Sequence, residues 1–285
     1  MHNLAKSAKR SRIIKQSILI IVLTIFLVLS FLPIYYLLIK SFKDPDQETL
    51  KPYAITFPLC FDNYKIAWLF VKDYILNTIF IALIQTSGTL VVCSLASFAF
   101  VRYKFPIKKV LFMFILSFMM VPGILTLIPQ YRLVVTKLHL ANTYLGVVLP
   151  AITGAIPMGI FLLNTFFHGI PKELFEAAEI DGANKIQQYF ALVLPLSVPI
   201  LSTLALMQVM SAWNDLLWPT LILQDERMHT ISVGLQPFTT AYINEYLSYG
   251  VPFAGYVIVS LPLLIIFFFT SKQFIKGLTS GAFKM

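Results

Sequence analysis

Long runs of apolar residues alternate with short polar segments along nearly the whole chain. A helix needs about 20 apolar residues to cross the hydrocarbon core of a bilayer, and backbone groups in lipid must be hydrogen bonded within their own segment. Six runs meet this requirement, so the pattern predicts an all-α integral membrane protein with six transmembrane helices. We expect these helices at Ser17–Ile39, Tyr74–Val101, Val110–Tyr131, Asn142–Phe167, Tyr189–Trp213 and Val251–Ser271.

The composition agrees with this class of protein. Of the 285 residues, 58% are hydrophobic and 12% are charged, and the mean hydropathy is +0.80. Soluble domains carry about 25% charged residues, so this chain has too little polar surface to cover a water-soluble globule. We expect a basic N-terminal segment over 1–16, one membrane domain over 17–271 and a tail over 272–285.

The net charge of +9 comes from basic residues that flank the apolar runs. Such clustering is typical of membrane orientation, in which the basic side is cytoplasmic, and it does not indicate nucleic-acid binding. The distribution of basic residues places both termini in the cytoplasm. Because four predicted spans separate Glu173–Asn184 from the N-terminus, this segment is placed there too. The basic residues on this side are Lys6, Lys9, Arg10, Arg12, Lys15, Arg102, Lys104, Lys108, Lys109, Lys172, Lys185, Lys272, Lys276 and Lys284.

Several kinds of chemistry have no support in the sequence. The predicted spans contain no ionisable residue in their cores, and proton-coupled carriers usually need one there as a relay. No phosphate-binding loop is present and no catalytic triad, so the chain is not an evident enzyme. Cys60 and Cys93 follow no metal or disulfide spacing.

Neutral polar residues in the spans are candidates for a solute pathway. Gln85 and Gln208 are large and costly to bury unpaired. They fit either a pathway for a polar, uncharged solute or a hydrogen bond between helices, and the sequence leaves both possibilities open. Asn214 and Asp215, at the end of the fifth run, are the other two candidate pathway residues.

A short acidic segment follows the fourth run. Pro171 can open a helix at its first turn, and we expect a helix over about 171–185. At 100° per residue, one face holds Leu174, Phe175, Ala178, Gly182 and Ile186. Small residues allow another surface to approach closely. A helix lying on the membrane surface would carry Lys and Arg on its polar face, whereas this one carries Glu, so a protein partner is favoured.

This segment also resembles a known family. Glu176-Ala177-Ala178, then Gly182, then Leu192-Val193-Leu194-Pro195 resemble the EAA signature of permease subunits in bacterial ABC importers. The family pattern has Ile where Leu192 stands. The wider stretch Ile170–Pro199 is similar to the carbohydrate branch of this family, the permeases of maltose and oligosaccharide importers. So are the stretches at Ser41–Lys43, Asn63-Tyr64, Trp213–Asp215 and Lys272–Lys284.

The resemblance implies the fold of a type I ABC importer permease, with the acidic helix as a coupling helix held in a cleft of a cytoplasmic ATPase. This chain would hold no cofactor, because ATP and Mg²⁺ would be bound by the partner ATPase subunits. The residues implied in coupling are Leu174, Phe175, Glu176, Ala177, Ala178, Asp181, Gly182, Leu194 and Pro195.

The implied partners are a second related permease chain, two ATPase subunits, an extracytoplasmic solute-binding protein and membrane lipid. The segment Asn214–Gly250 would be a docking element for the binding protein. An ion-coupled secondary carrier for a neutral polar solute remains the alternative, because sodium sites can be built from carbonyl groups. A membrane-embedded structural or receptor protein is a third class.

Overall fold

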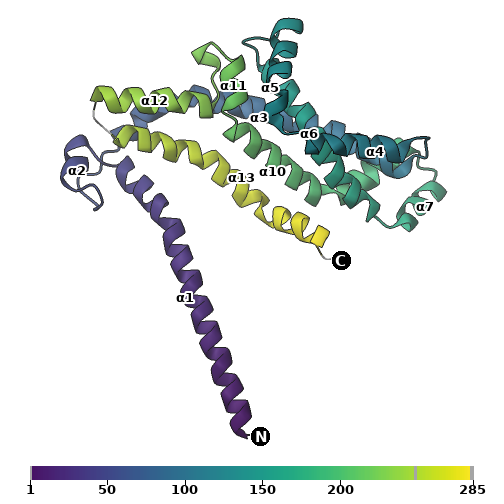
Figure 1. Cartoon of the computed structure of the whole chain (residues 1–285), viewed down its shortest axis with the longest axis horizontal. Coiled ribbons are helices and arrows are strands. Elements are labelled where there is room, and N and C mark those ends of the chain that lie inside the picture. Colours follow the sequence, from purple (N-terminus) through teal and green to yellow (C-terminus); the bar gives the residue numbers. More distant parts are fainter. Residues whose placement is uncertain (1, 247–248, 283–285) are drawn as a thin grey trace. The chain divides into compact units, whose positions relative to one another are not determined.

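The computed structural model describes residues 2–246 and 249–282, and this part of the chain is helical with no strand (Figure 1). The chain forms two compact units. The first comprises Met1–Leu69 and Phe238–Ile258, and the second comprises Phe70–Pro237 and Val259–Met285. Because backbone groups in lipid must find partners within their own segment, helices are the expected building blocks.

The first unit contains α1 (His2–Ser41), α2 (Pro45–Leu50), the start of α3 (Asp62–Arg102), the end of α12 (Ile231–Tyr246) and the start of α13 (Gly250–Ala282). A side-chain clamp closes the connection between α1 and α3. Asn63 Nδ2 donates to the carbonyl oxygens of Ser41 at 3.0 Å and Lys43 at 2.9 Å, and the hydroxyls of Ser41 and Tyr64 lie 2.7 Å apart. The clamp brings the stretch Ser41–Lys43 into contact with Asn63-Tyr64.

The second unit is built around α3, α6 and α10, and Figure 1 shows the order of its helices. Its core includes Cys93 and Phe98 of α3 and Leu163 of α6, all buried. Its elements after α3 are α4 (Lys108–Ser117), η1 (Phe118–Met120), α5 (Gly123–Tyr131), η2 (Arg132–Lys137), α6 (Tyr144–His168), α7 (Lys172–Ile180), α8 (Lys185–Gln188), η3 (Tyr189–Val193), α9 (Leu194–Leu196), α10 (Val198–Asn214), α11 (Leu217–Ile222), η4 (Glu226–Met228), the start of α12 and the later part of α13.

Four helical stretches in the described residues are long and apolar enough to cross a membrane: Lys15–Ser41, Asp62–Arg102, Tyr144–His168 and Gly250–Ser271. The third and fifth predicted spans are not straight helices. Each is a bent pair, and counting each pair as one span gives six. The pairs are Lys108–Met120 with Gly123–Lys137, bent by 95°, and Lys185–Leu196 with Val198–Asn214, bent by 75°.

Proline explains both bends. Val121 precedes Pro122 and has an extended conformation, with φ −84° and ψ 117°, which is the conformation that a following proline favours. Pro195 and Pro199 lack the N–H groups that would continue the helical ladder through the second bend. There the Ser197 N–H bonds to the carbonyls of Val193 at 3.0 Å and Leu194 at 3.1 Å.

The helices extend beyond the apolar runs. The second predicted span begins at Tyr74, but α3 begins at Asp62, because a polar turn ends a hydrophobic run without ending a helix. For the same reason the predicted outer loop Asn214–Gly250 contains α11, η4 and α12. Apolar periodicity predicts the part of a helix that can lie in lipid, whereas backbone hydrogen bonding sets the helix ends.

A close contact between α3 and α6 generates a prediction. A Cβ added at Gly159 would lie 2.5 Å from Cys93 Sγ, whereas a Cβ added at Gly154 has nothing within 4 Å. We expect Gly159→Ala to destabilise the chain by about 1–3 kcal/mol, the usual cost of overpacking a core. Thermal unfolding in detergent, followed by tryptophan fluorescence, measures this.

Gly154→Ala is the matched control in the same helix. It should be neutral or should stabilise by up to about 1 kcal/mol, because alanine loses less conformational freedom than glycine in a helix. Equal unfolding temperatures for the two variants would contradict the close packing of α3 against α6.

Candidate functional site

Helix α7 follows Pro171 and is shorter than the predicted helix over 171–185, because its last helical residue is Ile180. Gly182 has φ +80°, the left-handed conformation that glycine adopts without steric cost. Its N–H bonds to Glu179 O at 3.1 Å, and the Ala183 N–H bonds to Ala178 O at 2.9 Å. These two bonds form a Schellman motif, which satisfies the last carbonyls of a helix and stops it.

The chain then starts a new helix. Asn184 and Gln187 form a capping box at the start of α8, with each side chain bonded to the backbone N–H of the other residue. Gly182 and Ile186 therefore do not continue the face that begins with Leu174 and Ala178. That part of the sequence prediction is wrong, because the left-handed residue resets the direction of the helix.

Phe175 anchors α7 to its own chain. Its side chain is 2% exposed and belongs to the core cluster that includes Phe167 and Tyr189. The guanidinium carbon of Arg102 lies 3.9 Å from the centre of the Phe175 ring, a cation–π contact. We expected Phe175 on the partner-facing side, but the structure places it in the core, where apolar side chains surround the ring and the Arg102 guanidinium contacts it.

Glu179 joins three elements. Its carboxylate accepts hydrogen bonds from Arg102 Nη2 of α3 at 3.1 Å, from Lys185 Nζ of α8 and from Gln188 Nε2 at 3.4 Å. These donors, Lys185 first among them, hold the pKa of the Glu179 carboxyl below its ordinary value. Together with Phe175, Glu179 fixes the inner side of α7 to the ends of α3 and α8.

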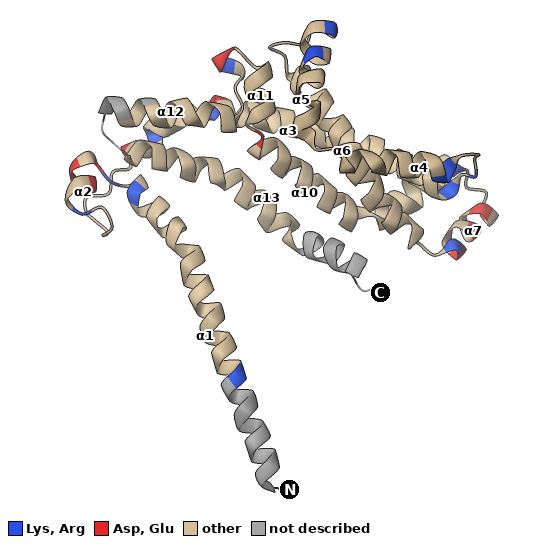
Figure 2. Ribbon diagram, in the orientation of Figure 1, with Lys and Arg blue, Asp and Glu red and all other residues tan. Residues whose placement is uncertain are grey.

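The opposite side of α7 is open to solvent. Leu174, Glu176, Ala177 and Ile180 are exposed, and Ile180 is exposed to 87%. Ala178 is half-buried, and Asp181 and Gly182 are exposed beyond the last turn. Figure 2 shows charged residues gathered on α7 and few along the helices of the same unit that precede it. The exposed face combines a large apolar side chain with carboxylates, which suits a protein partner.

Leu194 and Pro195, two of the residues implied in coupling, lie beside the second bend. Leu194 is half-buried against the core cluster, and Pro195 is exposed. Just before them, the hydroxyl of buried Tyr189 lies 2.6 Å from Ser94 Oγ of α3. The segment after α7 is therefore bonded to α3 immediately before the chain bends.

The candidate pathway residues separate into two pairs. Gln85 and Gln208 are 3% and 7% exposed, and Gln85 Nε2 donates to Gln208 Oε1 at 3.2 Å. This is a bond between α3 and α10, and a role of the two glutamines in the solute pathway stays a prediction. Asn214 donates to Met210 O at 2.8 Å, and Asp215 accepts from the Trp218 N–H at 3.3 Å. These last two residues lie at the end of α10, about 9 Å beyond Gln208 at 1.5 Å per residue.

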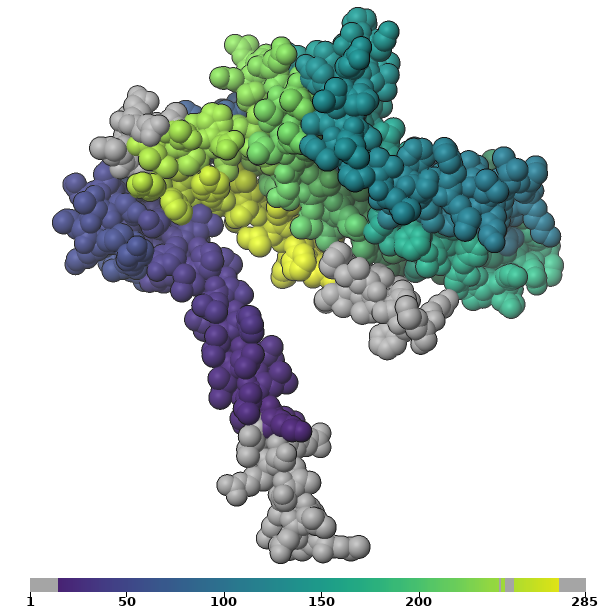
Figure 3. All heavy atoms as spheres, in the orientation of Figure 1, coloured from purple at the N-terminus to yellow at the C-terminus, as the bar shows by residue number. Residues whose placement is uncertain are grey.

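The segment after α10 is held by bonds that the sequence pattern did not predict. Trp218 Nε1 donates to Gly146 O at 3.0 Å. Asn142 Oδ1 accepts from the N–H groups of Gln224 and Asp225, both at 3.0 Å. Val134 of η2 and Ile222 of α11 share one buried cluster, and Figure 3 shows the two segments side by side. The only sequence signal was the polar Asn142 at the start of an apolar run.

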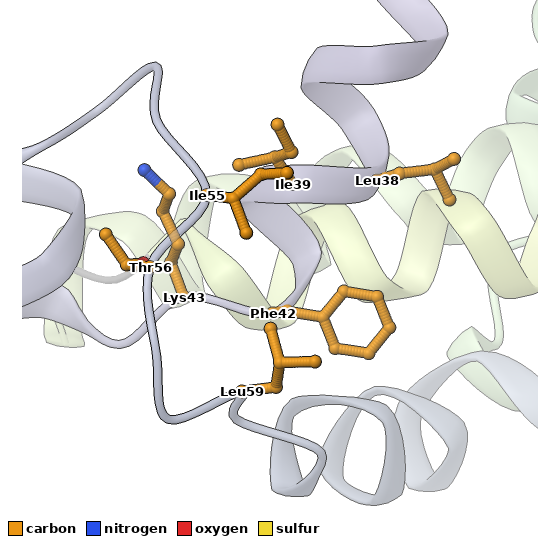
Figure 4. A pocket seen from close by; sticks show the side chains of 7 residues that line it. All are labelled: Leu38, Ile39, Phe42, Lys43, Ile55, Thr56 and Leu59. Atoms are coloured by element: carbon orange, nitrogen blue, oxygen red, sulfur yellow. The ribbon is translucent and has the colours of Figure 1, made fainter.

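A cavity of 210 Å³ lies in the first unit, beneath the segment that follows α2 (Figure 4). In Figure 4 the amino group of Lys43 points away from Phe42 and Leu59. Lys43 is 1% exposed and donates to the carbonyl oxygen of Lys51. This bond ties the Lys43 side chain to the end of α2 and holds the segment that follows it in place.

The family model described as "Binding-protein-dependent transport system inner membrane component" matches residues 93–279. The chain belongs to this family. It is a multi-pass bacterial inner membrane protein and the transmembrane permease subunit of a binding-protein-dependent ABC importer. Such subunits are not catalytic, since the ATPase is a separate protein, and the complex also uses a binding protein. Membership of this family contradicts the alternative of an ion-coupled secondary carrier.

Individual relatives agree over nearly the whole length. The arabinooligosaccharides transport system permease protein AraQ of Halalkalibacterium halodurans is 32% identical over 260 residues, covering 88% of this chain and 90% of the relative. The trehalose/maltose transport system permease protein MalG of Thermococcus litoralis is 30% identical, covering 96% and 99%.

The fold is also that of a solved transporter. A crystal structure of a bacterial ABC transporter involved in the import of the acidic polysaccharide alginate contains a similar chain, with a TM-score of 0.81 and 24% sequence identity. The match covers 93% of this chain and 98% of the other. The arrangement of helices is therefore that of an ABC importer permease.

The three bonds to Glu179 generate a prediction. Glu179→Gln removes the charge that attracts Arg102 and Lys185, so the amides of α7 and α8 should exchange hydrogen faster, by a factor of about two to five for an exposed ion pair. Hydrogen–deuterium exchange with mass spectrometry measures this. Glu173→Gln is the control, because Glu173 is an exposed acid of the same helix.

The effect should depend on pH in one direction. Because the pKa of Glu179 is lowered in the folded chain, its contribution is present above the ordinary glutamate pKa and is lost as the pH falls through the lowered value. The exchange rates of wild type and Glu179→Gln should therefore converge in acid. A difference that persisted after protonation would contradict the electrostatic role.

Proposed function

We propose that the chain pairs with a second, related permease and imports a sugar or oligosaccharide, and that α7 transmits the motion of a cytoplasmic ATPase. The substrate class is supported by relatives. The printed names of AraQ and MalG give arabinooligosaccharides and trehalose or maltose, and a third relative, MelC of Bacillus subtilis, is an import permease for melibiose, raffinose and stachyose.

The observation that carries the coupling role is the two-sided construction of α7. Phe175 and Glu179 fix one side to the core and to α3 and α8. The other side presents Glu176, Ala177 and Ile180 to solvent. A protein that moved this exposed face would therefore pull on α3 and, through the segment ending at Leu194-Pro195, on the bend before α10.

The charges support a cytoplasmic position for α7 and for both termini. Arg102 ends α3, and Lys108 and Lys109 begin α4. Because Arg102 is ion-paired with Glu179, these basic residues lie at the same membrane face as α7. Basic residues favour the cytoplasmic side. In this orientation Glu226 and its neighbours lie outside the cell.

The outer segment after α10 is suited to docking the binding protein. Gln224, Asp225, Glu226 and Arg227 are exposed, yet the backbone beneath them is bonded to Asn142 and Asn77. A fixed polar surface loses little conformational freedom on binding. Asn214, exposed at the end of α10, and Asp215 are candidates for contact with the solute, as are Gln85 and Gln208.

Glu176 provides a direct test of the coupling role. It is exposed and makes no hydrogen bond or ion pair with another described residue, so Glu176→Lys should leave the fold intact. If α7 contacts the ATPase, the reversed charge should lower ATPase binding by about tenfold or more, since facing like charges are costly. Co-purification and surface plasmon resonance with the ATPase measure this.

Glu226→Lys is the control, because it makes the same charge change at an exposed residue on the proposed outer side. It should leave ATPase binding unchanged. Equal ATPase affinity for wild type and Glu176→Lys would remove Glu176 from the proposed contact.

Transport itself is tested in proteoliposomes that hold the complete complex. Uptake of a labelled oligosaccharide should need ATP, the ATPase and the binding protein together. Uptake driven by an ion gradient without the ATPase would contradict the proposal. ATP-driven uptake of a solute that is not a sugar would contradict only the substrate class.

A further inference from the structure

A second cavity, of 360 Å³, lies in the second unit where three helices end or begin. It is lined by Phe100 of α3, by Lys108, Lys109 and Phe112 of α4, and by Asn164 and His168 of α6. These residues lie near the ends of α3 and α6 and the start of α4, so the cavity is at a membrane face. The basic residues mark this face as cytoplasmic.

The lining carries positive charge that nothing in the described chain balances. Lys108 Nζ donates to the Tyr103 carbonyl at 3.1 Å, and no carboxylate lines the cavity among the described residues. Nearby Arg102 is different, because Glu179 pairs with it. An anion in the cavity would therefore meet the two lysines without competition from an acidic side chain.

The start of α4 also favours an anion. Its N-cap residue, Ile107, has φ +57° and gives no side-chain cap, and the first turn holds no acid. Two lysines instead occupy the end of a helix that the helix dipole makes positive. Helix N-termini bind phosphate because their first N–H groups lack intrahelical acceptors.

Asn164 gives an independent sign of a ligand. It is 8% exposed, and its Oδ1 is buried without a hydrogen-bond partner in the described residues. Its backbone carbonyl is 2.8 Å from His168 Nδ1, which fixes the neighbouring ring. A side-chain amide needs both an acceptor and a donor, so a ligand with phosphate and hydroxyl groups would complement it.

The apolar walls distinguish a lipid from a free anion. Phe100 and Phe112 line the cavity, and the exposed side chains of Met113 and Phe114 continue along α4. We propose that this cavity binds the headgroup of an anionic phospholipid that carries hydroxyl groups, of the phosphatidylglycerol type, with an acyl chain along α4. Basic pockets between transmembrane helices on the cytoplasmic side are suited to such headgroups. An ethanolamine headgroup would bring its ammonium group close to the lysines.

The test uses the whole transporter complex, purified and mixed with defined lipids, and native mass spectrometry counts the bound lipid. Lys109→Gln should weaken phosphatidylglycerol binding about fivefold, the contribution of one basic residue near a lipid surface. Lys104→Gln is the matched control: Lys104 is exposed in the same segment and does not line the cavity. It should bind lipid as the wild type does.

A second arm tests the headgroup. Phosphatidylmethanol has the same charge as phosphatidylglycerol but no hydroxyl group. The wild type should prefer phosphatidylglycerol by about two- to tenfold, the range for one net hydrogen bond, and Asn164→Leu should lose this preference.

Three results would overturn the proposal. Equal losses in Lys109→Gln and Lys104→Gln would mean diffuse attraction to the membrane. Displacement of the lipid by millimolar inorganic phosphate would mean a site for a soluble anion. No preference between the two anionic lipids in the wild type would remove Asn164 from the site.

Discussion

A backbone N–H or C=O group that leaves its helix inside a bilayer finds no water to replace the lost bond. This constraint accounts for the helical fold and for the way its irregular points are built. The chain bends by 95° after η1 and by 75° before α10, each time beside proline. At the second bend the Ser197 N–H finds acceptors within its own segment, so the bend leaves this backbone N–H bonded.

The early end of α7 decides which elements its side chains can reach. The Schellman motif at Gly182 ends α7 early and lets α8 begin in a new direction. Glu179 can then bond to α8 and to Arg102 at the same time. The same ion pair satisfies the charge at the end of α3. Among the described residues, no such carboxylate lines the cavity with the lysines at the start of α4. The acidic helix α7 and this basic cavity are the two surfaces that we propose for a protein partner and for an anionic lipid.

The regions between spans are ordered by polar side chains bonded to backbone. Asn63 closes the connection between α1 and α3, and Asn142 holds the segment after α11. Each asparagine satisfies two backbone groups that would otherwise have to bond to water. This explains why long connections between the spans contain short helices and fixed turns.

The sequence alone determined the class, the number of apolar runs and the place of the acidic helix, because membrane thickness and helical period are properties of short stretches. The signature at Glu176–Ala178 and Gly182 also indicated the family that the comparison confirmed. Only the tertiary structure decided that Phe175 faces the core and that Gln85 bonds to Gln208. It likewise placed Asn164, whose buried Oδ1 has no partner in the described residues, and Lys109 in the lining of one cavity. Periodicity gives the face of a residue within its own helix, whereas its neighbour depends on how distant segments pack.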